Sequence, residues 1–216
     1  MSNIRFRLAK PSDAKQIANV HLHIRDKDDQ GFFAHVNYSF LKQYYRVMLD
    51  DANEIIICSE DENGKILGFS SGSLDATKQM ESMRDHKFSF VLPLITSAFS
   101  SPSLIKSALD RFRSTKGESV NKYVTTEGPR LEYWGWLPDA QGSEASVEMQ
   151  EVLFLFMKTL GAEKLYFEVD KVNKKVLKFH KFNGAVESTT YTLPDGRERV
   201  EMFYDMNTFE FKYIKA

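Results

Sequence analysis

The stretch from Leu137 to Asp170, "LPDAQGSEASVEMQEVLFLFMKTLGAEKLYFEVD", contains a strand end, a turn, a helix and a second strand. Apolar residues recur at helical spacing between Met149 and Leu160, and Gly161 is a typical helix terminator. "KLYFEVD" then has the composition and length of a strand. This order indicates a strand–turn–helix–strand unit and places the chain in the α/β class.

The segments on either side of this unit complete one sheet. "NIRFRLA" alternates apolar and polar residues, which predicts a first strand, and two amphipathic helices follow it. "NEIIICSEDENGKILGFSSGSL" predicts an antiparallel hairpin, and a second hairpin ends the chain around Gly196. We therefore expect one α/β (α+β) domain over residues 1–216, with a mixed, mostly antiparallel central sheet flanked by helices.

Residues 75–126 interrupt this pattern with a long segment that contains no predicted strand. Helical patches occur in "FSFVLPLITSAF" and "SLIKSALDRFR". A bare loop of this length is uncommon in a compact domain, so we expect a helical insertion, one use of which is a lid. The alternative is that the insertion packs over the core or forms a homodimer contact.

Composition excludes several classes of function. The 29 basic and 30 acidic residues give a net charge of −1, which provides no field for nucleic acid or an anionic membrane. Cys58, the single cysteine, lies in the apolar run "EIIICS" and is expected to be a buried, unreactive thiol. No apolar run reaches about 18 residues and no signal-peptide pattern is present, so we expect a cytoplasmic protein without stable membrane insertion.

The order of elements resembles the GNAT superfamily of acyl-CoA-dependent N-acetyltransferases. Three segments carry the resemblance: "LPDAQGSEAS", the strand and helix "LGAEKLYFEVDKVNKKVLKFHKFNGAVES", and the hairpin "GKILGFSSGSL". Residues 31–75 and the insertion resemble bacterial relatives associated with surface-polysaccharide and amino-sugar biosynthesis. The resemblance implies acetyl-CoA as co-substrate, no metal, and a small-molecule amine as acceptor, with a nucleotide-linked amino sugar as one candidate.

The resemblance assigns the acyl-CoA pyrophosphate to the turn before the predicted helix. Such a turn holds an anion because backbone N–H groups at a helix N-terminus lack intrahelical partners. In this chain Glu144 and Ser146 replace small residues of the family pattern, and an ordinary capped helix start is the alternative. The implied cofactor-binding residues are Trp136, Gln141, Gly142, Ser143, Glu144, Ala145, Ser146 and Asn173.

Acyl transfer from a thioester to an amine requires a polarised carbonyl, a neutral amine and a proton for the leaving thiolate. The resemblance implies the N–H of Trp136 as the oxyanion donor and His180, at the position of a family tyrosine, as the acid. Strand alternation places Arg130, Glu132 and Trp134 on one face, so Glu132 is the candidate base. The alternatives are a solvent-facing Glu132 and a merely packed His180.

Two hypotheses from different classes follow. The first is an N-acetyltransferase, and the second is a catalytically degenerate binding or interaction module with the same scaffold. Glu144, Ser146 and the missing tyrosine favour the second. A third hypothesis, membrane docking through "FVLPLITSAF" and "RFRSTK", is weak because the segment has no clear basic face.

Overall fold

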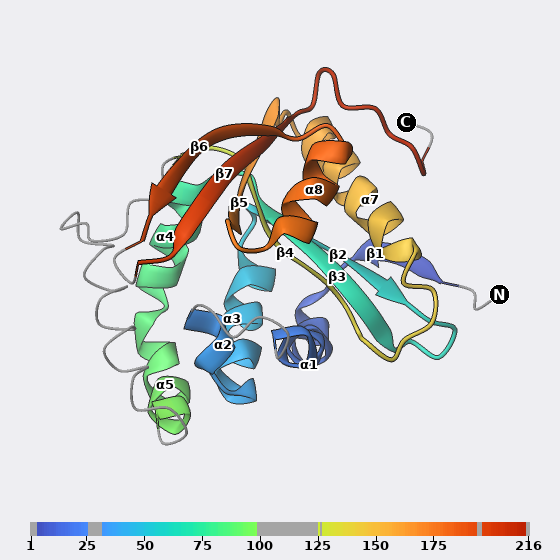
Figure 1. Cartoon of the computed structure of the whole chain (residues 1–216). Helices are drawn as coiled ribbons and strands as arrows, with labels where there is room; N and C mark the ends of the chain where they lie inside the picture. Colours follow the sequence, from blue (N-terminus) through green and yellow to red (C-terminus); the bar gives the residue numbers. More distant parts are fainter. Residues whose placement is uncertain (1–3, 26–31, 99–124, 126, 194–195, 215–216) are drawn as a thin grey trace.

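The computed structural model of the chain describes residues 4–25, 32–98, 125, 127–193 and 196–214 (Figure 1). Their strands form one seven-stranded sheet in the order β1-β2-β3-β4-β5-β7-β6. All neighbouring strands are antiparallel except β4 and β5, which are parallel. The predicted mixed, mostly antiparallel sheet is confirmed.

The elements follow the predicted order. The strands are β1 (Arg5–Leu8), β2 (Glu54–Glu60), β3 (Ile66–Ser73), β4 (Arg130–Trp136), β5 (Lys164–Asp170), β6 (Val186–Thr192) and β7 (Glu198–Asp205). The helices are α1 (Ala14–Arg25), α2 (Phe32–His35), α3 (Tyr38–Asp50), α4 (Ala76–Asp85), α5 (Val91–Ala98), α7 (Ala145–Thr159) and α8 (Lys174–Phe182). Short 3-10 turns cover Pro11–Asp13 and Lys87–Phe90.

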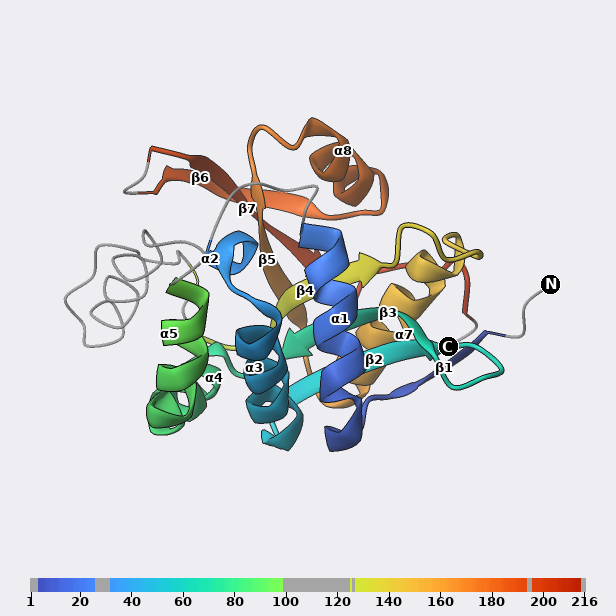
Figure 2. The same cartoon turned by 90° about the horizontal axis from the view of Figure 1, so that it is seen from below.

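Helices cover both faces of the sheet, and each face has its own apolar core. Helices α1 and α3 lie on one face, whereas α7 lies on the other (Figure 2). Ile56 and Phe69 point into the core under α1 and α3, while Leu131 and Phe167 point into the core under α7 and α8. Because strand side chains alternate between two covered faces, β3 is buried along its whole length and β2 is buried from Ile56 to Glu60.

A buried histidine and the single cysteine lie in the core under α1 and α3. His21 is 3% exposed, and its Nδ1 lies 2.6 Å from Oη of Tyr45. Burial lowers the pKa of His21 to about 3, so the imidazole is a neutral core group. Cys58 is fully buried, and burial raises the pKa of its thiol to about 11, as expected for an unreactive cysteine.

The first part of the predicted insertion is helical. Helices α4 and α5 fall within it, and Asp75 caps α4 by accepting a hydrogen bond from the amide of Thr77 at 2.9 Å. The predicted helical patch at 103–113 and residues 194–195 of the last turn lie outside the described residues. Within the described part of the chain, no helix is long and apolar enough to cross a membrane.

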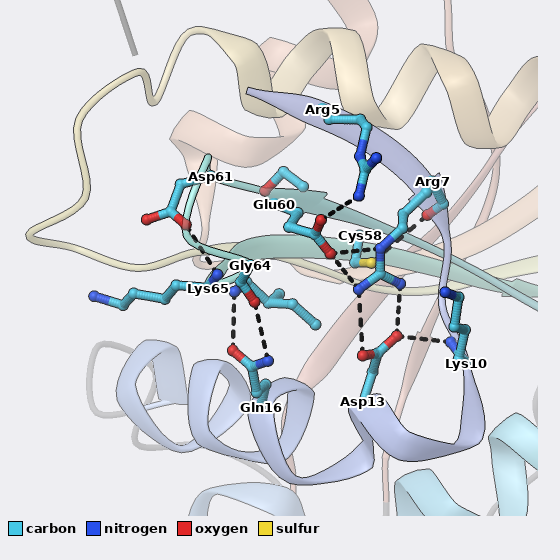
Figure 3. Close-up of polar contacts among 12 residues, drawn as sticks. Arg5, Arg7, Lys10, Asp13, Gln16, Cys58, Glu60, Asp61, Gly64 and Lys65 are labelled. Atoms are coloured by element: carbon cyan, nitrogen blue, oxygen red, sulfur yellow. Dashed lines mark hydrogen bonds and ion pairs between the residues drawn. The ribbon is translucent and has the colours of Figure 1, made fainter. Parts of the chain in front are cut away.

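A group of paired charges joins β1, β2 and the start of α1 at one edge of the sheet (Figure 3). We call Arg5, Arg7, Asp13 and Glu60 the Arg7 cluster. Arg7 donates from Nε to Glu60 and from Nη1 to Asp13, both at 2.6 Å, and Arg5 also contacts Glu60. The cluster fixes the edge strand β1 against α1, and each carboxylate in it has a guanidinium partner.

Candidate functional site

Strands β4 and β5 separate soon after they meet. The parallel pair has a single register position, Arg130 opposite Tyr166, next to a 3.3 Å hydrogen bond from the amide of Tyr166 to the carbonyl of Pro129. Beyond that position β4 continues to Trp136 without pairing to β5. No described strand pairs with the rest of this edge of β4, where a ligand could bond to the backbone.

A β-bulge in β4 lies directly beside this opening. The register with β3 passes from Ser70 opposite Trp134 to Gly72 opposite Leu131, so Glu132 and Tyr133 together oppose Ser71. The Ser71 hydroxyl accepts from the amide of Tyr133 at 3.1 Å and fills the irregularity. The bulge inserts one residue, which changes the face of every side chain that follows.

The bulge overturns the predicted alternation along β4. Glu132 and Tyr133 lie on the side of α1 and α3, whereas Trp134 packs in the core under α7 and α8. Arg130, Glu132 and Trp134 therefore do not share one face. Simple alternation failed because nothing in "RLEYWGWL" marks an extra residue in the strand.

The amide of Trp136 points toward the open side of β4. The next amide, that of Leu137, donates to the carbonyl of Leu67 on β3 at 2.8 Å. Successive amides of a strand point to opposite edges, so the N–H of Trp136 faces β5, and so does that of Trp134. The amide of Trp136, predicted as the oxyanion donor, thus faces the open edge of β4, and so does the amide of Trp134, which sequence reasoning did not single out.

The turn before α7 presents open amides, though not all those expected. Those of Ala145 and Ser146 donate to the carbonyls of Gly142 and Ser143, at 2.9 and 3.1 Å. Within the described residues, the amides of Gly142, Ser143 and Glu144 have no hydrogen-bond partner. The helix begins with 3-10-type hydrogen bonds, which use the amides of Ala145 and Ser146. The open amides are therefore those at the N-terminal end of the predicted set.

The side chains of the turn leave those amides accessible. Gln141, Ser143 and Glu144 are exposed, and the carboxylate of Glu144 makes no capping hydrogen bond. Gly142 has φ of +76°, a left-handed conformation that favours glycine, and a Cβ there would meet Ile4 at 2.6 Å. The glycine is therefore required where it stands, although Glu144 and Ser146 depart from the family pattern.

An indole ring lies where the opening meets the two helices. Trp134 donates from Nε1 to the carbonyl of Ser146 at 3.0 Å, and its ring centroid lies 5.3 Å from that of Phe179 on α8. The ring therefore spans from the first turn of α7 to α8. Sequence reasoning missed this role because it placed Trp134 on the other face of β4.

His180 lies on the buried face of α8. It is 5% exposed, its Nδ1 lies 2.7 Å from Oη of Tyr204, and its ring contacts Phe167 at 4.5 Å between centroids. Burial lowers the pKa of His180 to about 4, so the imidazole is neutral at pH 7. The Trp134 ring, 6.3 Å away between centroids, lies beside it.

Asn173 precedes α8 and caps it. Its side-chain oxygen accepts from the amide of Val176 at 3.3 Å, which leaves its amide NH2 group for other contacts. Asp170 and Lys174, on either side of Asn173, line a surface cavity of about 380 Å³ with the β6–β7 turn. This cavity lies at the end of β5.

Carboxylates gather on the opposite face of the bulge. Glu132 forms an ion pair with Nε of Arg130 at 2.8 Å. Glu54, on β2, lies close enough to Glu132 that burial first, and that neighbour second, raise the pKa of Glu54 to about 8. Among the described residues, no group of three or more His, Cys, Asp or Glu side chains could hold a metal ion.

Comparisons with known proteins concern the fold. Neither protein-family models nor curated protein sequences match the chain. A GNAT-family acetyltransferase from Streptococcus pneumoniae is similar in structure, with a TM-score of 0.56, 11% identity, and 94% of this chain and 99% of that chain covered.

Two further solved structures are similar over nearly their whole length. The ribosomal-protein-S18-alanine N-acetyltransferase from Escherichia coli has a TM-score of 0.53 and 13% identity, with 99% of each chain covered. The spermidine/spermine N-acetyltransferase from Vibrio cholerae has a TM-score of 0.53 and 14% identity, with 94% of this chain and 93% of that chain covered. The chain therefore has the fold of the GNAT acetyltransferases.

Proposed function

We propose that the protein is an acyl-CoA-dependent N-acetyltransferase that transfers acetyl from acetyl-CoA to the primary amine of a small molecule. The observation that carries the proposal is the β4–β5 pair, which opens after one register position, together with the three open amides in the turn that joins the end of β4 to α7. A thioester arm can enter such an opening and bond to the free edge of β4 while the amides hold its diphosphate. The similar solved structures support this reading because they are acetyltransferases.

The residues take distinct roles in this proposal. The amides of Gly142, Ser143 and Glu144 hold the pyrophosphate, with Gln141 shaping the approach, and the N–H of Trp136 polarises the thioester carbonyl. The amine attacks that carbonyl, a C–N bond replaces the C–S bond, and the amine proton passes to a carboxylate beside the bulge. The predicted base Glu132 is on the required face, but its charge is neutralised by Arg130.

The proton donor is the weakest part of the predicted mechanism. His180 is neutral at pH 7, and its Nδ1 already contacts Tyr204, so only Nε2 can interact with the sulfur. A neutral imidazole is a poor acid for a thiolate. We therefore propose that His180 orients the arm and that the thiolate leaves without a proton from this residue.

The second candidate function is a binding module without catalysis. The observation that favours it is the Trp134 indole, which lies between α7 and α8 at the point where the arm enters. In this second candidate the ring stays in place and closes the route of the arm to the edge of β4. The nucleotide-linked amino sugar and the polysaccharide-related branch remain predictions.

A titration with acetyl-CoA, followed by calorimetry, tests both candidates. Ser143→Pro removes one open amide without changing charge and is expected to weaken acetyl-CoA binding about tenfold, whereas Ser143→Ala keeps the amide and the affinity. Release of free thiol with an amine acceptor then reports catalysis. Equal affinity of Ser143→Pro and Ser143→Ala would reject the turn as the diphosphate site, and absence of binding at high micromolar acetyl-CoA would reject the transferase.

The acidic neighbour of the site is tested separately. Glu144→Gly removes the carboxylate of a residue whose amide we assign to the diphosphate. Tighter acetyl-CoA binding is therefore expected if the side chain faces the phosphates. Glu62→Gln, an exposed glutamate in the β2–β3 turn, is the control for a general change of charge. An unchanged dissociation constant for Glu144→Gly would show that the carboxylate faces solvent.

A further inference from the structure

Two buried histidine–tyrosine pairs lie on opposite faces of the sheet. In each pair a histidine Nδ1 lies within hydrogen-bond distance of a tyrosine hydroxyl, at 2.6 Å for His21 and Tyr45 and at 2.7 Å for His180 and Tyr204. All four side chains are at most 5% exposed. Tyr45 belongs to the core under α1 and α3, and Tyr204 to the core under α7 and α8. The chemistry of the pairs is the same, so their surroundings decide what each histidine can do.

The His180 ring lies beside the two strands that separate. Its centroid is 4.5 Å from that of Phe167 on β5 and 6.3 Å from that of Trp134 on β4. The sheet order places β7, which carries Tyr204, on the far side of β5 from β4. Nδ1 of His180 therefore faces β7. Nε2 projects from the other side of the imidazole, toward β4 and the opening.

The hydroxyl of Tyr204 determines which nitrogen of His180 carries the proton. Burial raises the pKa of Tyr204, so the hydroxyl keeps its proton and needs an acceptor. Among the described residues, Nδ1 of His180 is its one hydrogen-bond partner. Buried donors in folded proteins are almost always satisfied, so Tyr204 donates to Nδ1. The neutral imidazole then carries its single proton on Nε2.

Aromatic contacts hold the Tyr204 ring in place. Its centroid lies 5.4 Å from that of Phe167, 4.9 Å from that of Phe154 on α7 and 5.3 Å from that of Phe209, which follows β7. Close packing on three elements restricts the rotation of the tyrosine. The hydrogen bond to Nδ1 in turn restricts the rotation of the His180 ring.

The Nε2–H group of His180 lacks a partner within the protein. In the part of the chain that the structure describes, Nε2 makes no hydrogen bond, yet protein atoms do not fully enclose it. The rest of the side chain is buried among aromatic rings. His180 is therefore a fixed donor with one accessible N–H, which a molecule that enters the opening can reach.

We propose that Tyr204 is a positioning residue that holds His180 with its Nε2–H directed at the sulfur of the bound thioester. The role rests on the proposed N-acetyltransferase function, because that sulfur belongs to the acyl-CoA substrate. When the C–S bond breaks, its electron pair stays on sulfur, and Nε2–H stabilises this thiolate by a hydrogen bond without giving up its proton. The thiolate takes a proton from solvent after it leaves.

Nitrogen NMR of the ligand-free protein with isotope-labelled histidine tests the tautomer without any reaction. At pH 7 we expect His180 to have an unprotonated Nδ1 that accepts a hydrogen bond and a protonated Nε2. The signal that disappears in His180→Gln identifies the residue. A proton on Nδ1 would overturn the proposal, whatever reaction the protein catalyses.

Coenzyme A and desulfo-coenzyme A, which has the same arm without the sulfur, test the contact itself. Coenzyme A is expected to shift the Nε2–H signal of His180, and desulfo-coenzyme A is not. The signal of His21, on the other face of the sheet, should respond to neither. An equal response of His180 to both compounds, or no response when calorimetry shows coenzyme A bound, would overturn the proposal and leave the transferase function intact.

Tyr204→Phe removes the hydroxyl and keeps the ring. Calorimetry should show that coenzyme A binds the unmodified protein about fivefold more tightly than desulfo-coenzyme A, and that this ratio falls to about one in Tyr204→Phe. The matched control is Tyr45→Phe, which removes the same kind of hydrogen bond from His21 and should keep the ratio. A merely structural role of Tyr204 would weaken both compounds alike and leave the ratio unchanged.

An unchanged ratio in Tyr204→Phe, or an equal loss of the ratio in Tyr45→Phe, would overturn the role of Tyr204. Absence of any coenzyme A binding would overturn that role together with the transferase function. Both NMR measurements observe the unmodified protein, so they decide the question if Tyr204→Phe does not fold.

Discussion

Strand β2 begins and ends with a glutamate, and the two have opposite environments. Glu54 and Glu60 lie an even number of residues apart, so both side chains point to the same face of the sheet. Hydrogen bonds from Arg7 and Arg5 hold the pKa of Glu60 below its ordinary value. At Glu54, burial and then Glu132 raise the pKa to about 8, and no guanidinium from the described part of the chain is bonded to it.

The difference separates charges that hold the fold from charges that cost stability. Glu60 belongs to the Arg7 cluster, in which Arg7 also fixes Asp13 at the start of α1 (Figure 3). Glu54 has only uncharged partners, the side chains of Ser73 on β3 and Gln79 on α4, and their hydrogen bonds do not offset the effect of burial on its pKa. Buried groups whose charge has no opposite charge beside it are typical of functional sites, because they are retained at a cost to stability.

Breaking the Arg7 cluster is expected to have the largest effect. Arg7→Met leaves Asp13, 7% exposed, as a buried carboxylate without its guanidinium, and should lower the free energy of unfolding by about 3 kcal/mol. Urea denaturation at pH 7 measures the loss, and acetyl-CoA affinity should not change.

The control is Lys181→Met, which breaks the exposed pair with Glu187. Its expected cost is at most about 0.5 kcal/mol because solvent already screens that pair. Similar losses in the two variants would show that the Arg7 cluster is no more than an ordinary surface pair.

Much of the fold could be predicted from the sequence. Apolar periodicity and turn residues gave the order of strands and helices, including the β2–β3 hairpin around Gly64, since these signals are local. The Arg7 cluster was not foreseen, because Arg7, Asp13 and Glu60 meet only after β1 pairs with β2. Contacts of that kind depend on register and leave no local pattern.

Neutralising Glu54 is expected to stabilise the protein. A carboxyl group whose folded pKa is about 8 binds a proton in the folded state at pH values where the unfolded state has lost it. Stability therefore falls as pH rises from about 4.5 to about 8. Glu54→Gln should remove that slope and raise the free energy of unfolding by about 2 kcal/mol at pH 8.5, measured by urea denaturation.

Measuring the stability of Glu54→Gln at both pH 5 and pH 8.5 separates the effect of the Glu54 charge from that of its shape. At pH 5 Glu54 is protonated in the folded state, so Glu54→Gln and the unmodified protein should differ little. Glu62→Gln in the exposed β2–β3 turn serves as the control and should be neutral at both values. Equal stabilisation by Glu54→Gln at both pH values would mean that the charge of Glu54 is not the cause.

The candidate site was predictable in part, and the limit again lies in register. The turn at 141–146 could be located from its place between a strand and a helix, and its open amides follow from helix geometry. The face of β4 on which Trp134 lies could not be predicted, because the bulge opposite Ser71 adds a residue that the apolar–polar alternation does not reveal. Glu168 and Glu201 become neighbours only through the β5–β7 pairing, which no local pattern in the sequence reveals.

The smallest effect is expected for Asp13→Asn, and it should depend on pH in the opposite way to the effect of Glu54→Gln. Burial alone would raise the pKa of Asp13, but hydrogen bonds from Arg7 and from the amide of Lys10 outweigh it and hold that pKa below its ordinary value. A lowered folded pKa means that the contribution of Asp13 is present above about pH 4 and is lost as pH falls through the folded pKa. Asp13→Asn should therefore cost about 1 kcal/mol at pH 7, and its deficit against the unmodified protein should shrink toward pH 2, as measured by urea denaturation. Glu54→Gln gains its advantage on the alkaline side, so the two differences should change at opposite ends of the pH range. A deficit of Asp13→Asn that stays constant from pH 7 to pH 2 would show that the shape of Asp13 matters, and not its charge, and the contrast in pH dependence between the Arg7 cluster and Glu54 would be lost.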